Sequence, residues 1–167
     1  MRHFLSFIIA LCFAISSYAQ IPSQVMGINL GKTPKATAIS IFKKKGMTIA
    51  HQEKEHVFLY GNIFHHDVKW EYVHLVIKQS KVAGVEFYCL NNNDALLKSL
   101  NSGLFSKYGT CWKTKAKIIG YIPGLTPDEF NETYVYSNGK NRIQLYRHYY
   151  HGMALYLSYM NENLVKK

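Results

Sequence analysis

The stretch KWEYVHLVIKQSKVAGVEFYCL, residues 69–90, decides the class of fold. Residues 69–78 and 82–90 each alternate between core-type apolar side chains and the remaining side chains, a pattern typical of half-buried strands. The polar residues 79–81 separate the two segments. The better core set of the first strand is Val73, Leu75 and Ile77. The opposite face of that strand carries Trp70, Tyr72 and His74. Two alternating strands joined by a short polar turn predict an antiparallel hairpin.

The rest of the chain predicts further strands and two helices around this hairpin. Apolar residues at helical spacing indicate helices over residues 34–45 and 95–108, the first of them capped by Thr33. A capping box at residues 126–129 indicates one more helical turn. Further strands are expected at residues 57–64, 111–122, 132–137, 142–150 and 153–160. We therefore expect one α+β domain over residues 20–167, an antiparallel sheet with helices packed on one face, and we leave open a duplication of one helix-plus-meander unit.

The N-terminus predicts export. A short basic segment is followed by the apolar residues 4–15, and the small residues Ser17 and Ala19 stand at −3 and −1 of a cut after Ala19. The apolar run is too short to span a bilayer, and Leu11 stands before Cys12 where a lipoprotein signal has a small residue. We expect residues 1–19 to be removed as a signal peptide. The mature protein is then periplasmic or secreted and has no transmembrane segment.

The charge of the chain allows anionic partners without pointing to nucleic acid. There are 20 Lys+Arg against 10 Asp+Glu, a formal net charge of +10. The lysines are scattered, however, and Arg142 and Arg147 are the only arginines after residue 19. Proteins that read nucleic acid depend on clustered arginines. We therefore expect general basicity and no nucleic-acid partner.

Two cysteines follow the signal peptide, Cys89 and Cys111. Export leads to a compartment in which disulfides persist, so one bridge between them is an open possibility. The alternative is two separate thiols that pack as small apolar side chains. A spacing of 22 residues gives no support to a redox or zinc motif.

Residues 26–46, MGINLGKTPKATAISIFKKKG, resemble the opening of small exported bacterial proteins of the β-lactamase-inhibitor-protein-like fold. The order of a helix before a meander also resembles the related outer-membrane assembly lipoproteins. The resemblance implies a layered α/β unit, often duplicated, that acts as a binding module rather than an enzyme. This chain departs from the assembly lipoproteins because it has no lipobox. The matching positions are Gly27, Ile28, Leu30, Gly31, Lys45 and Gly46, with Lys107, Tyr108 and Gly109 after the second helix.

Three histidines are candidate metal ligands: His65, His66 and His74. Imidazole nitrogens are common ligands of zinc, and adjacent histidines can converge in a turn although they diverge in a strand. A metal-binding protein or a hydrolase that uses this region is therefore the alternative function. The sequence contains no nucleophile elbow, phosphate loop or dinucleotide fingerprint. We expect no cofactor, and the absence of these motifs favours binding over catalysis.

Aromatic residues supply the candidate binding surface. Helices on one face of a sheet leave the other face open, and alternation assigns aromatic side chains to that open face. Such an amphipathic surface is typical of protein or glycan recognition. The predicted function is a non-enzymatic binding module for an unidentified protein or glycan of the cell envelope. The candidate binding residues are Trp70, Tyr72, His74, Tyr88, Tyr146 and Tyr156, with Tyr134 and Tyr136 as further candidates for the same face.

Overall fold

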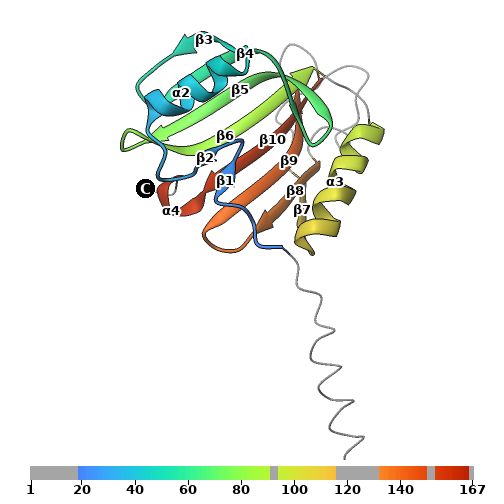
Figure 1. Ribbon diagram of the computed structural model, residues 1–167. Helices are drawn as coiled ribbons and strands as arrows, with labels where there is room; N and C mark the ends of the chain where they lie inside the picture. Colours follow the sequence, from blue (N-terminus) through green and yellow to red (C-terminus); the bar gives the residue numbers. More distant parts are fainter. Residues whose placement is uncertain (1–18, 91–93, 116–131, 150–152, 166–167) are drawn as a thin grey trace, which may run out of the picture.

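A computed structural model describes residues 19–90, 94–115, 132–149 and 153–165 (Figure 1). The signal peptide expected at residues 1–19 lies outside these ranges, apart from Ala19. The capping box expected at residues 126–129 also lies outside them, as do residues 116–122 of the strand expected at 111–122. No helix within the described ranges is both long enough and apolar enough to cross a membrane.

The described part of the chain forms short N-terminal strands and then two similar series of elements. The N-terminal part holds β1 (Gln24–Val25) and β2 (Ile28–Asn29), which pair with each other. The first series is α2 (Lys35–Lys44), β3 (Thr48–Gln52), β4 (His56–His65), β5 (Val68–Lys78) and β6 (Lys81–Leu90). The second series is α3 (Asp94–Tyr108), β7 (Trp112–Lys115), β8 (Glu132–Ser137), β9 (Asn141–Tyr149) and β10 (Met153–Asn161), followed by α4 (Glu162–Val165).

Eight of the strands form one antiparallel sheet in the order β3-β4-β5-β6-β10-β9-β8-β7. Each series contributes four strands that follow one another as a meander, and the last strands of the two meanders, β6 and β10, pair in the centre of the sheet. The fold is therefore α+β and dominated by an antiparallel sheet, which confirms the predicted class at that level. The predicted strands within β4–β6 and β8–β10 agree with the structure to within about two residues.

One hydrophobic core joins the sheet to the helices. The predicted core residues Val73, Leu75 and Ile77 are buried, and α2 and α3 contribute Phe42 and Leu97 to the same core. Alternation in β6, β9 and β10 places apolar side chains on this side of the sheet because every second residue points to the same face. These further core residues are Val85, Phe87, Ile143, Leu145, Leu155 and Leu157.

The prediction that Trp70 shares a face with Tyr72 is wrong. Trp70 is fully buried, its ring lies 6.0 Å from the ring of the core residue Phe87, and its Nε1 donates to the backbone oxygen of His65 at 2.9 Å. The reason is a register shift between β4 and β5: Tyr60 pairs with Tyr72, but Ile63 and not residue 62 pairs with Trp70. A bulge of this kind reverses the side-chain alternation on one side of it.

The predicted cap of the first helix is also wrong. The N-cap position of α2 is Pro34, which provides no side-chain hydrogen bond to the helix. The hydroxyl of Thr33 instead accepts a hydrogen bond from the backbone nitrogen of Asn29, with an Oγ1–N distance of 2.8 Å. Thr33 therefore closes the turn before the helix and leaves the first turn of α2 without a side-chain cap.

Candidate functional site

Five tyrosines lie side by side across five neighbouring strands on the sheet face opposite the core residues. The register places Tyr60 opposite Tyr72, Tyr72 opposite Tyr88, Tyr88 opposite Tyr156, and Tyr156 opposite Tyr146. We call these five residues the tyrosine row. Four of its five members come from β5, β6, β9 and β10, so it crosses the junction between the two meanders.

The rings of the tyrosine row stack on one another. The rings of Tyr72 and Tyr88 are 4.4 Å apart and nearly parallel, with an interplanar angle of 1°. The rings of Tyr146 and Tyr156 are 4.8 Å apart at 4°, and those of Tyr88 and Tyr156 are 5.4 Å apart at 23°. The ring of Tyr60 is tilted at 52° against that of Tyr72, 5.0 Å away. Cross-strand aromatic pairs of this kind stabilise a sheet and fix the orientation of each ring.

The row is half-buried by its own stacking. Tyr60, at the end of the row, is 54% exposed, and the other four are partly exposed. Burial raises the pKa of Tyr88 to about 12, with smaller contributions from Tyr72 and Tyr156. Burial and then the Glu86 carboxylate raise the pKa of Tyr146 further. Tyr88 and Tyr146 therefore stay protonated at physiological pH and act as neutral hydroxyls.

A chain of hydrogen bonds runs beside the tyrosine row on the same face. The hydroxyl of Tyr146 donates to Oε1 of Glu86 at 2.6 Å, and Nδ1 of His74 lies 3.3 Å from Oε2 of Glu86. Nε2 of His74 lies 2.9 Å from Nδ1 of His56. Phe58 stacks on His74 with ring centroids 4.3 Å apart and planes at 5°. The aromatic face therefore continues from the tyrosine row onto this chain.

These hydrogen bonds order the side chains of the face. A carboxylate oxygen accepts hydrogen bonds, so a proton on Nδ1 of His74 lets that ring donate to Glu86 and accept at Nε2 from Nδ1–H of His56. The contacts link Tyr146, Glu86, His74 and His56 and can fix the shape of the face. No serine or cysteine takes part in them.

The structure separates the three predicted metal ligands. His74 belongs to the hydrogen-bonded chain described above, whereas His65 and His66 lie with Tyr159, whose ring contacts the core residue Phe87. Across the described ranges, no group of three or more histidine, cysteine, aspartate or glutamate side chains is arranged to hold a metal ion. The predicted set of His65, His66 and His74 therefore does not form one site.

His65 and His66 do converge, as the sequence analysis allowed for a turn. His66 and Asp67 have φ values of 52° and 59°, which make the tight turn between β4 and β5. Nε2 of His65 lies 3.0 Å and Nε2 of His66 lies 2.8 Å from the hydroxyl oxygen of Tyr159. Burial lowers the pKa of His65 to about 4 and lowers that of His66. Both imidazoles are therefore neutral near pH 7, and they form a polar cluster with Tyr159 at the edge of the core, where His65 is partly buried and His66 is exposed.

The two cysteines do not form a disulfide. Cys89 is buried and Cys111 is partly exposed, and both are free thiols. Burial raises the pKa of the Cys89 thiol to about 11, so little of the reactive thiolate is present near neutral pH. The alternative of two separate thiols is the one that the structure contains.

Tyr134 and Tyr136 do not belong to the open face. They pair with Leu145 and Ile143, so they point to the core side of the sheet. Tyr136 is 1% exposed, and its hydroxyl donates to Oδ1 of Asn101 in α3 at 2.7 Å. Sequence reasoning assigned them to the wrong face because it had no register for β8 against β9.

Sequence reasoning also missed three residues of the face. Tyr60 extends the tyrosine row, and His56 and Phe58 supply the end of the hydrogen-bonded chain and the stacking partner of His74. A signal for two of them was present: in β4 the buried residues Val57 and Leu59 alternate with Phe58 and Tyr60. No protein-family model, no curated protein and no solved structure matches this chain.

Proposed function

We propose that this protein is a non-enzymatic, exported protein-binding domain whose contact surface is the tyrosine row. The observation that carries the proposal is the stacked row itself, five rigid amphipathic side chains on adjacent strands. Tyrosine is enriched at protein interfaces and among the residues that dominate binding energy, because it adds large contact area at a low cost in side-chain entropy.

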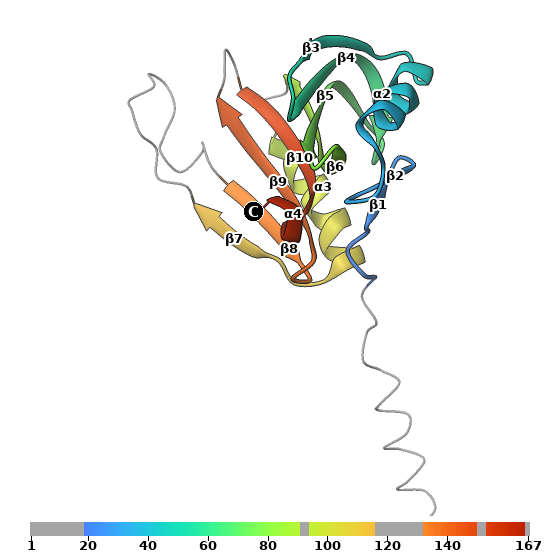
Figure 2. The same cartoon turned by 90° about the vertical axis from the view of Figure 1, so that its left-hand side faces the viewer.

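The row requires an open sheet face, and we infer that α2 and α3 both pack on the other one. Buried side chains of the two helices, Phe42 and Leu104 among them, share one core with Val73 and Leu145. In Figure 2, which turns the molecule by 90°, α2, the β1–β2 hairpin and the lower part of α3 all lie to the right of strands β7 and β8. The partial exposure of the tyrosines supports the same arrangement, because a helix packed on them would bury them.

The geometry of the rings favours a protein partner over a glycan. A sugar ring binds an aromatic side chain by laying its C–H groups on the face of the aromatic ring, where the negative charge of the quadrupole lies. In this row the faces of Tyr72, Tyr88 and Tyr156 are occupied by neighbouring tyrosines. What remains for a partner is a ridge of ring edges and hydroxyls, and these suit the backbone and side-chain groups of a protein.

The resemblance to the β-lactamase-inhibitor-protein-like fold agrees with this proposal, and we propose that fold and an internal duplication for the chain. The support is the order of elements: a helix and a four-stranded meander occur twice, and the two meanders meet at β6 and β10. Export rests on the sequence of residues 1–19, which has the basic, apolar and small-residue order of a signal peptide.

The test is site-specific photo-crosslinking in the native host. A photoreactive phenylalanine derivative replaces Tyr60, which is 54% exposed, and the matched control carries it at Phe105 of α3, which is 47% exposed and lies outside the row. We expect one defined protein adduct from position 60 and none from position 105. The captured protein is then purified and its affinity measured with Tyr72→Ala, which should weaken binding by tenfold or more.

Two outcomes contradict the proposal. The same adducts at positions 60 and 105 indicate a surface without specificity. Saturable binding of an oligosaccharide that Tyr72→Ala abolishes, without any protein adduct, shows that the row is a glycan site. Circular dichroism of each variant confirms that the sheet is intact.

A further inference from the structure

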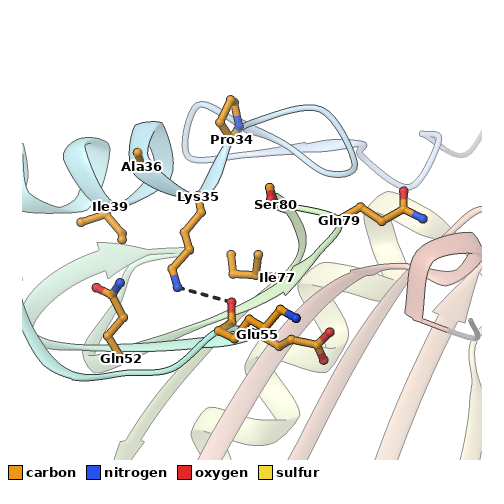
Figure 3. A pocket seen from close by; sticks show the side chains of 10 residues that line it. Pro34, Lys35, Ala36, Ile39, Gln52, Glu55, Ile77, Gln79 and Ser80 are labelled. Carbon is orange, nitrogen blue, oxygen red and sulfur yellow. Dashed lines mark hydrogen bonds between the residues drawn. The ribbon is translucent and has the colours of Figure 1, made fainter.

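A pocket of about 630 Å³ lies away from the tyrosine row, between α2 and two turns of the first meander (Figure 3). Pro34, Ala36 and Ile39 of the α2 segment and Ile77 of β5 supply its apolar surface. Its other lining residues are Lys35, Gln52, Lys54, Glu55, Gln79 and Ser80. Small-molecule sites in proteins usually enclose about 300–1,000 Å³ and combine apolar walls with a few polar groups. The pocket has both properties.

Lys35 joins three walls of the pocket. Its backbone nitrogen donates to the backbone oxygen of Ser80 at 3.0 Å, which fixes the β5–β6 turn against the start of α2. Its Nζ donates to the backbone oxygen of Glu53 at 2.5 Å and lies 3.4 Å from that of Lys54, which fixes the β3–β4 turn (Figure 3). The backbone nitrogen of Ile77, in the floor, donates to the oxygen of Glu55 at 2.7 Å. The walls are therefore preformed, which lowers the cost of binding.

The charges around the pocket favour an anion. Glu55 is the only acidic lining residue, and it accepts a 2.7 Å hydrogen bond from Nζ of Lys78, which lowers its pKa. Its charge is thus neutralised by a lysine that does not line the pocket. Lys35 and Lys54 remain as lining cations, and the first turn of α2 contains no acidic residue. A ligand with one negative group and an apolar body complements this distribution.

We propose that this pocket binds a small amphipathic anion, an apolar body that carries one carboxylate. The apolar body lies on Ile39 and Ile77, and the carboxylate lies at the rim near Lys54. The site is independent of the tyrosine row, because its floor residue Ile77 is on the core side of the sheet. The protein therefore has two separate binding surfaces.

The probe for this site is sodium octanoate, titrated into isotope-labelled protein and followed by the amide signals of Ala36 and Gln79. We expect saturable shifts below about 10 mM octanoate. Octanol and octyltrimethylammonium, which share the chain but lack the negative charge, should bind at least about threefold more weakly. Equal binding of the three probes overturns the assignment of an anionic ligand, and the absence of saturable shifts overturns the site.

Two variants with matched controls locate the binding. Ala36→Trp fills the pocket from an exposed helix position, and Thr37→Trp adds the same side chain at the next position, which does not line the pocket. Lys54→Glu reverses a rim charge, and Lys98→Glu makes the same change on the exposed side of α3. We expect Ala36→Trp to abolish octanoate binding and Lys54→Glu to weaken it, with both controls like the wild type. Unchanged binding in Ala36→Trp and Lys54→Glu overturns the proposal, and either variant alone suffices where the other is unfolded.

Discussion

The hydroxyl of Tyr146 reaches Oε1 of Glu86 at 2.6 Å although a whole strand, β10, lies between the strands that carry them. The residue opposite Glu86 on β10 is Ser158, which is 1% exposed and small. A larger side chain at that position would stand between the two groups. The two meanders are thus connected by a charge-assisted hydrogen bond in addition to the pairing of β6 with β10.

Tyr146→Phe should destabilise the protein by about 2 kcal/mol, because a half-buried carboxylate loses a strong donor and the apolar contacts of the ring stay. Urea unfolding measures the change. Tyr72→Phe is the matched control, since its hydroxyl makes no hydrogen bond to any described residue, and it should change stability by less than about 0.5 kcal/mol. Equal stabilities of the two variants would contradict a role for the hydrogen bond to Glu86.

Gly84→Ala should destabilise the sheet because of one neighbour. A Cβ atom at position 84 would lie 2.1 Å from Sδ of Met160, its register partner on β10. We expect a cost of about 1–2 kcal/mol in the wild type and less than about 0.5 kcal/mol in a Met160→Ala background. A double-mutant cycle by urea unfolding gives the coupling, and additive effects would show that the cost does not come from the Met160 side chain.

Gly61 and Gly139 should respond differently to alanine although both have a positive φ. The φ of Gly61 is +148°, and an added Cβ would lie 3.1 Å from the backbone oxygen of Gly46 and from Cα of Met47. Gly139 has a φ of +80° and no atom within 4 Å of an added Cβ. Gly139→Ala should cost about 1 kcal/mol of backbone strain, and Gly61→Ala about 2–3 kcal/mol. Thermal unfolding ranks the two, and a reversed order would contradict the close approach at Gly61.

Acidification should destabilise the protein through His65. Burial lowers the pKa of His65 in the folded protein to about 4, below the ordinary value of 6.5. Between pH 4 and pH 6.5 the unfolded chain therefore binds more protons than the folded protein does. The stabilising contribution of neutral His65 is fully present above about pH 6.5 and is lost as the pH is lowered toward 4. The free energy of unfolding therefore falls by roughly 2 kcal/mol between pH 7 and pH 5. His66, whose pKa is also lowered, adds to the same trend.

Urea unfolding of His65→Gln at the two pH values checks this origin. The variant should lose most of the difference between pH 7 and pH 5, whereas His51→Gln, at a side chain that is 61% exposed, should keep it. An unchanged pH dependence in His65→Gln would assign the effect to other groups.

Alternation of side chains predicted most of the fold. Val73, Leu75 and Ile77 are buried as expected because burial on one face leaves only one acceptable register for a strand. β1, β2 and β3 were not predicted, since the first two have two residues each and all five residues of β3 are exposed. Such segments contain no periodic pattern of apolar residues from which a strand could be predicted.

The candidate site was predicted in part, and the misplaced residues have specific causes. Tyr72, His74, Tyr88, Tyr146 and Tyr156 share the face that alternation assigned to them. Trp70 lies on the other face because of the bulge at residues 61–62 of β4, which face the single residue 71 of β5, and a bulge in the neighbouring strand leaves no pattern in the sequence of β5. The contact between Glu86 and Tyr146 depends on β10 entering between β6 and β9, and a linear sequence does not contain that order of strands.

The central position of β10 has a consequence for the order in which the protein is made. The ribosome finishes the strands of the first meander early, but β6 keeps an unpaired edge until residues 153–161 have been synthesised and can pair with it. The middle of the sheet therefore closes last, after the other seven strands of the sheet have been made. Until then the exposed edge of β6 can pair with other strands, and a chaperone is most needed there.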